Sequence, residues 1–77
     1  MPRKITPEKI EEVKQAIAEY EYRKNGMHRL NGADVIIRNI RMRKDKAVAD
    51  IVLIFEDRQE RYNDLDYDFK ILGVDLE

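Results

Sequence analysis

Cysteine, serine and tryptophan are absent from this sequence of 77 residues, and threonine occurs once, at Thr6. Without cysteine there is no disulfide framework, no thiolate metal site and no cysteine nucleophile. Without serine there is no acyl-transfer site built on a serine nucleophile. The only histidine, His28, has no neighbouring carboxylate in the sequence with which to share a metal ion, and no glycine-rich phosphate loop is present. We therefore expect no metal, no cofactor and no catalytic residues, which leaves an enzyme possible only through carboxylates and tyrosines.

Long hydrophobic runs are also missing. The longest run, Ile51 to Phe55, has five residues, whereas a membrane span needs roughly 18. The first residues, Met-Pro-Arg-Lys-Ile, lack the apolar segment of a signal peptide, so we expect a cytoplasmic protein with no membrane partner. Abundant isoleucine, arginine, lysine and glutamate with little serine, threonine or glutamine is typical of thermophile proteins, although two heat-fragile Asn-Gly pairs argue against that origin.

The residues that are present predict one small α+β domain over residues 1–77, since a chain this short forms a single core. Thr6 and Pro7 mark a helix start, with a hydroxyl cap followed by proline at the first helical position. Apolar residues then recur at helical spacing until Gly26 interrupts the pattern. The sequence therefore predicts a helix over 7–24.

Beyond residue 33 the content of β-branched residues rises and the apolar period changes to two, which predicts strands. We expect three of them, over 35–43, 47–56 and 61 to about 72. Short polar turns separate them, so the simplest assembly is an antiparallel three-stranded meander with the second strand central. The helix is expected to lie across the apolar face of this sheet, giving an α-β-β-β order.

The sheet face away from the helix is predicted to carry apolar residues on adjacent strands. Strict alternation along each strand places Val35 and Ile37 beside Val52 and Ile54. A contiguous apolar patch usually marks an interface, and a chain of this length is marginal on its own core. The first interpretation is therefore a non-enzymatic interaction module that uses these four residues to form a homodimer or to bind a protein partner. Cover by neighbouring Arg and Lys stems is the alternative.

Charge is segregated along the chain. Residues 21–46 hold eight bases against three acids, a net +5, whereas residues 47–77 hold three bases against nine acids, a net −6. The second interpretation is a nucleic-acid-binding protein whose bases contact phosphates. Against it, no aromatic residue lies among the bases of the first strand. The alternative is that the basic strand lies beside the acidic strand and neutralises it within the sheet. The candidate phosphate contacts are Arg23, Lys24, Arg29, Arg41, Arg43, Lys44 and Lys46.

Two charged positions inside the strands suggest a third interpretation, a small-ligand-binding or carboxylate-based catalytic cup. Alternation places Arg38 on the helix-covered face, where it either deters aggregation or anchors an anionic ligand. Asp50 is the one charge within the central strand, and we expect it to pair with Arg41 and to lie near Asp66 or Asp68. A structural ion pair is the simpler outcome there than an acid–base site.

Three aspartates alternate along the third strand, at Asp64, Asp66 and Asp68. This spacing also opens a calcium-binding loop, but that loop needs glycine at its sixth position, where this chain has Phe69. We therefore expect the three carboxylates to form the solvent face of an edge strand, where charge discourages edge-to-edge aggregation.

Overall fold

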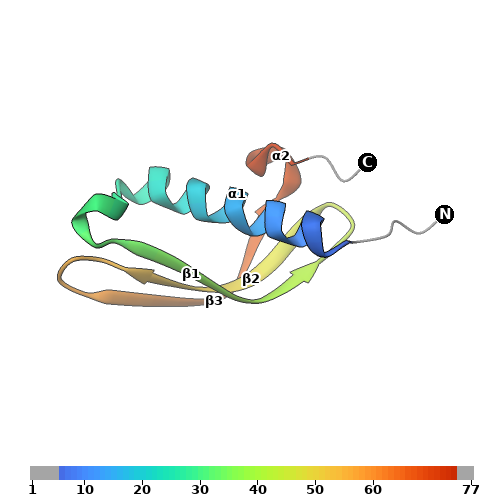
Figure 1. Ribbon diagram of the computed structural model, residues 1–77. Coiled ribbons are helices and arrows are strands. Elements are labelled where there is room, and N and C mark those ends of the chain that lie inside the picture. Colours follow the sequence, from blue (N-terminus) through green and yellow to red (C-terminus); the bar gives the residue numbers. More distant parts are fainter. Residues whose placement is uncertain (1–5, 75–77) are drawn as a thin grey trace.

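In the computed structural model, which describes residues 6–74, a long helix lies on one side of a three-stranded sheet (Figure 1). The strand order β1-β2-β3 is antiparallel throughout, so the predicted α+β meander with a central second strand is confirmed. In chain order the elements are α1 (Pro7–Asn25), the 3-10 helix η1 (Arg29–Asn31), β1 (Asp34–Met42), β2 (Lys46–Ile54), β3 (Gln59–Asp68) and the short helix α2 (Phe69–Leu72).

Both ends of α1 are fixed by local chemistry. The Thr6 hydroxyl accepts a hydrogen bond from the Lys9 backbone N–H at 3.2 Å, which satisfies one of the free donors at the start of the helix. Gly26 takes the left-handed conformation, with φ of 62°, and its N–H donates back to the last turn. These are the signals that predicted the helix from the sequence.

The core lies between α1 and the sheet. Alternate residues of β2 point toward the helix, as its period-two pattern predicted. These four residues are almost completely buried: Ala47, Ala49, Ile51 and Leu53. Val13 and Ile17 of α1 pack against them, and neither side chain is exposed at all. The buried apolar core consists of Val13, Ile17, Met27, Ala47, Ala49, Ile51, Leu53, Tyr67 and Phe69.

Each outer strand contains a β-bulge at the level of Asp50. The pairing with β2 shifts by one residue between Arg38 and Arg41 in β1, and again between Tyr62 and Leu65 in β3. An extra residue is inserted at each place, and Asn39 (φ 54°) and Asp64 (φ 57°) adopt the left-handed conformation there. Asparagine and aspartate tolerate this conformation better than other residues with a side chain. Each bulge reverses the alternation of side chains along its strand.

The bulge in β1 explains why part of the predicted interface lies on the other face. Val35 and Ile37 pair with Leu53 and Ile51, so they point toward α1 and pack against the core. The period-two count was wrong because it ran through the strand without a break. With the extra residue inserted, core-facing positions are odd-numbered before the bulge and even-numbered after it.

The same shift moves Arg38 to the face away from the helix, where its backbone pairs with Asp50. The expected position beneath the helix was therefore wrong.

The third strand is shorter than predicted. It ends at Asp68, and Phe69–Leu72 form the helix α2, which closes one end of the core. The Phe69 side chain is buried, and its N–H donates to the carbonyl of Asp45 in the turn between β1 and β2. Ile71 lies within the predicted third strand, where strict alternation would place it on the same face as Tyr67, but it is 59% exposed.

Candidate interaction site on the open face of the sheet

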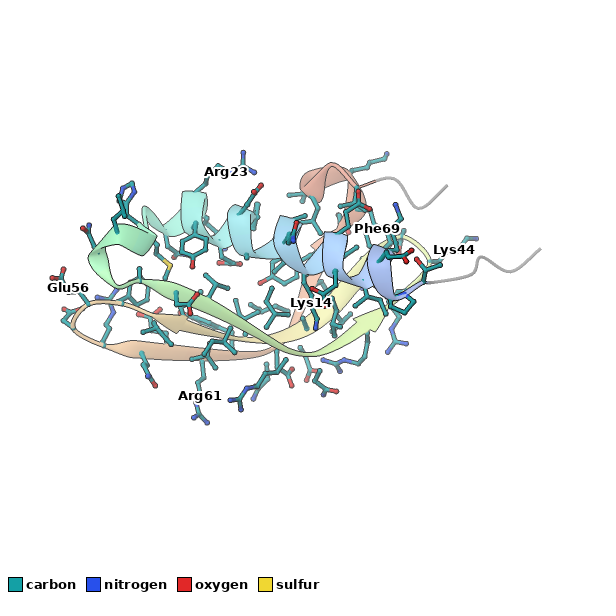
Figure 2. The ribbon with its side chains drawn as sticks, in the orientation of Figure 1. Lys14, Arg23, Lys44, Glu56, Arg61 and Phe69 are labelled. Atoms are coloured by element: carbon teal, nitrogen blue, oxygen red, sulfur yellow. The ribbon has the colours of Figure 1, made fainter. Side chains whose placement is uncertain are left out.

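The side of the sheet opposite α1 and α2, called the open face below, is covered by no element among residues 6–74 (Figure 1). Figure 2 shows Arg61 of β3 pointing from this face away from α1. The pairing register identifies its side chains on all three strands. They are Ile36, Arg38 and Arg41 of β1; Lys46, Val48, Asp50, Val52 and Ile54 of β2; and Gln59, Arg61, Asp64, Asp66 and Asp68 of β3.

An apolar strip runs across one half of the open face. Ile36 and Val52 are direct cross-strand partners, and Ile54 lies beside them. All three are half-buried although no other described element covers them, because neighbouring side chains on the sheet cover part of their surface. Val48, further along β2, is only 9% exposed. The structure thus keeps Val52 and Ile54 of the predicted interface together and puts Ile36 where Val35 and Ile37 were expected.

A hydrogen-bonded network joins the two bulges through Asp50. Arg41 forks between two carboxylates, with Nη2 3.2 Å from Asp50 Oδ1 and Nη1 2.8 Å from Asp64 Oδ1. Asp50 Oδ1 also accepts the backbone N–H of Asp64 at 3.0 Å, and Oδ2 accepts from Asn39 Nδ2 at 3.4 Å. Arg41 Nε in turn donates to the Asn39 carbonyl at 3.1 Å. The expected Arg41–Asp50 pair is confirmed, but the second carboxylate is Asp64 rather than Asp66 or Asp68.

This network is structural rather than an acid–base pair. The Asp64 backbone N–H, with help from Asn39 and Arg41, holds the pKa of Asp50 below its ordinary value. Asp50 is therefore ionised at neutral pH and is engaged by donors of its own chain. Arg41 bonds to both carboxylates, so a cation bridges Asp50 and Asp64.

Charge divides the open face into two edges. Arg38 and Arg41 project from β1, whereas Asp64, Asp66 and Asp68 project from β3. We call these two groups the basic edge and the acidic edge. Lys46 pairs with Asp66 at 3.0 Å within the chain. Arg38 is exposed and makes no ion pair with any side chain among residues 6–74.

The candidate phosphate contacts whose side chains the structure describes do not form one surface. Figure 2 shows Arg23 near the C-terminal end of α1 and Lys44 in the β1–β2 turn, toward opposite ends of the molecule. Arg41 and Lys46 are held in ion pairs with aspartates, and the ammonium of Lys24 lies 5.8 Å from the ring centre of Tyr20. Arg43 is exposed beside Lys44, and the backbone of Arg29 is in η1.

A buried carboxylate, Glu21, was missed by the sequence analysis. Its side chain is 3% exposed, and its two oxygens accept hydrogen bonds from the Tyr67 hydroxyl at 2.8 Å and from Asn25 Nδ2 at 3.0 Å. Burial, together with the hydrogen bond to Glu21, raises the pKa of Tyr67, so the phenol keeps the proton that it donates. The available signal was the spacing of Glu21 from Val13 and Ile17, eight and four residues along one helix face.

Hollows also lie in the described surface outside the open face. One hollow, of about 460 Å³, is an open depression at the end of α1 beside Tyr22, Met27 and His28. A smaller one of about 90 Å³ lies beside Glu21 and Tyr67, whose polar atoms already bond to each other. Within residues 6–74, no group of three or more acidic or histidine side chains is placed to hold a metal ion. No helix in this range is long and apolar enough to cross a membrane.

Comparison of the chain with protein families, with curated proteins and with solved structures finds no match.

Proposed function

We propose that this protein is a non-enzymatic interaction module that self-associates through the open face of its sheet. The observation that carries the proposal is the apolar strip of Ile36, Val52 and Ile54, which occupies one half of a face that no described element covers, while the basic and acidic edges flank the other half. Apolar residues that gather on adjacent strands in this way are typical of interfaces. A second copy of the chain carries an apolar strip that can cover the first one, and it carries charges opposite to those of each edge. It is therefore complementary to the open face in both hydrophobicity and charge.

The edges of the sheet favour contact through the face rather than through added strands. A strand that extends a sheet needs an unbroken row of backbone donors and acceptors. Both edge strands are interrupted by bulges, at Asn39 and Asp64, which bend the strand and increase its local twist. Edge-to-edge pairing is therefore disfavoured on both sides, and the open face is left as the surface for association.

The size of the face sets the expected strength. Three strands of nine or ten residues cover roughly 30 Å by 14 Å, or about 400 Å² in projection for each copy. Two such faces approach the lower limit of about 1,000 Å² for a specific interface. We therefore expect a reversible dimer that dissociates on dilution, not an obligate one.

The test is the mass of the particle in solution as a function of concentration, by sedimentation equilibrium or light scattering. We expect twice the chain mass at high micromolar concentration. Val52→Lys should shift the equilibrium to monomer, because it places a charge in the apolar strip. Gln15→Lys, on the exposed side of α1, is the matched control and should leave the mass unchanged. A wild-type chain that stays monomeric at high micromolar concentration would overturn the proposal.

The nucleic-acid alternative has less support, because Arg41 and Lys46 are held in ion pairs within the chain, and Figure 2 shows Arg23 and Lys44 toward opposite ends of the molecule. Arg43 and Lys44, at the tip of the β1–β2 turn, are the pair on which that alternative now rests.

A further inference from the structure

Opposite charges on the two edges of the open face restrict how two copies can pack. We infer that they pack face to face about a two-fold axis parallel to β2, so that the basic edge of each copy lies over the acidic edge of the other. This inference rests on the proposed function, since it specifies the geometry of the same self-association.

The alternatives differ in which strands they superpose. A two-fold axis parallel to the strands places β2 over the partner's β2 and β1 over the partner's β3. A two-fold axis across the strands places β1 over the partner's β1, so that Arg38 and Arg41 face the same cations in the other copy. Like charges placed opposite each other cost free energy and opposite charges gain it. The first arrangement alone joins arginine to aspartate at both edges.

Symmetry also fixes the register. Rotation about an axis along the strands leaves the position of each residue along the strand unchanged, so each cross-strand row meets the same row of the partner. In the row of Ile36, Val52 and Arg61, valine meets valine at the centre. The usual angle of about 30° between packed sheets displaces the outer strands by about 2–3 Å, which is less than the roughly 6.7 Å between rows.

Two ion pairs follow from this register, and each occurs twice in the dimer. Arg38 lies over Asp64 of the partner subunit. Arg41, one row further along the strands, lies over Asp66 of the partner subunit. Arg38 has no ion-pair partner among residues 6–74 of its own chain, so it gains one only on association. It is therefore the residue that most strongly selects this orientation.

Asp50 lies close to the proposed axis and faces the partner's Asp50. The two carboxylates are not isolated charges, because each is already held by Arg41 and by the backbone N–H of Asp64. The axis is therefore compatible with both remaining ionised.

The experiment uses two charge-reversal variants. Each should dimerise poorly by itself, and the two should form a heterodimer when they are mixed. In Arg38→Glu, the new carboxylates lie over Asp64 of the partner subunit; in Asp64→Lys, the new ammonium groups lie over Arg38 of the partner subunit. Each homodimer should weaken by at least about tenfold in dissociation constant, because like charges face each other twice. In an equimolar mixture each reversed residue faces the other, and the unchanged edges also match, so the heterodimer should form in preference to both homodimers.

The readout is native mass spectrometry of the mixture with one variant isotopically labelled, supported by sedimentation. Arg23→Glu, a matched reversal on α1 away from the open face, should dimerise like the wild type. Far-ultraviolet circular dichroism checks folding, and the milder changes Arg38→Gln and Asp64→Asn should weaken the dimer less if a reversal misfolds.

The outcomes separate the two proposals. A monomeric wild type overturns the proposed function itself. If the wild type is dimeric but the folded charge-reversal variants dimerise as strongly as the wild type, or show no preference for the heterodimer, the orientation is overturned. The proposed function is retained in that case. Selective heterodimer formation supports both.

Discussion

Replacing Tyr67 by phenylalanine removes one hydroxyl group and tests how α1 is attached to β3. The Tyr67 hydroxyl donates to Glu21 Oε2 at 2.8 Å, and both side chains are less than 5% exposed. Phenylalanine keeps the ring in the core and leaves a carboxylate oxygen buried without its donor. The loss therefore falls on the hydrogen bond and not on packing.

The expected cost follows from the charge of the acceptor. A hydrogen bond to an ionised group contributes about 1.5–3 kcal/mol, and a buried acceptor left without a partner keeps its full desolvation penalty. We expect Tyr67→Phe to lower the free energy of unfolding by about 2–3 kcal/mol at neutral pH. For a domain whose total stability lies near the lower end of the usual range of about 5–15 kcal/mol, this is a large fraction.

Urea unfolding followed by far-ultraviolet circular dichroism measures this loss. With a slope of about 1 kcal/mol per molar urea for so small a chain, the midpoint should fall by about 2 M. All variants must be compared at one protein concentration, because dimerisation would add to the apparent stability.

Tyr20→Phe is the matched control. The Tyr20 ring meets Tyr67 edge-on, with 6.0 Å between ring centres, but its hydroxyl makes no hydrogen bond to the described part of the chain. Its removal should change the stability by less than about 0.5 kcal/mol. If the Tyr67→Phe and Tyr20→Phe variants have the same midpoint, the buried hydrogen bond to Glu21 contributes nothing and the reasoning fails. A double-mutant cycle of Tyr67→Phe with Glu21→Gln would then show whether the two side chains are coupled at all.

Two further predictions concern pH and polyanions. Because the folded chain holds the pKa of Asp50 below its ordinary value of 3.8, its stabilising effect is present above that value and is lost as pH falls through the lower, folded value. The stability of Asp50→Asn should therefore fall less steeply with decreasing pH than that of the wild type. Only part of the pH dependence should disappear, because the pKa of Glu60 is lowered too. If the urea midpoint falls equally steeply with decreasing pH below pH 5 in the two proteins, this prediction is contradicted. If Arg43 and Lys44 bind phosphate, affinity for generic DNA and RNA should fall steeply with salt, and Lys44→Glu should weaken it further. Undetectable binding at low salt would remove the nucleic-acid alternative.

Local sequence determined the elements of this protein. Thr6 and Gly26 mark the ends of α1 through interactions within a few residues, so no knowledge of the rest of the fold was needed. The apolar alternation of β2 identified its core face because this strand is regular from end to end. Short polar turns between successive strands made an antiparallel meander the simplest arrangement.

Tertiary structure decided which face the side chains of the outer strands occupy. Asn39 and Asp64 look like ordinary polar residues in the sequence, and their left-handed conformation becomes visible only when the strands are paired. A single inserted residue transfers every later side chain to the opposite face. For this reason Val35 and Ile37 belong to the core and Arg38 to the open face, the reverse of what uninterrupted alternation predicted.

The burial of Glu21 and the end of β3 were likewise beyond local pattern. A glutamate on a helix reads as solvent-facing unless a distant residue supplies a donor, and Tyr67 stands 46 positions further along the chain. Phe69 follows the alternation of β3, yet it forms a helical turn whose first N–H bonds to the carbonyl of Asp45. The local sequence pattern specifies a helix or strand when residues close in the sequence supply the hydrogen-bond partners and packing contacts that this element needs. Where the partner lies far away in the sequence, only the assembled fold decides between strand and helix, or between core and surface.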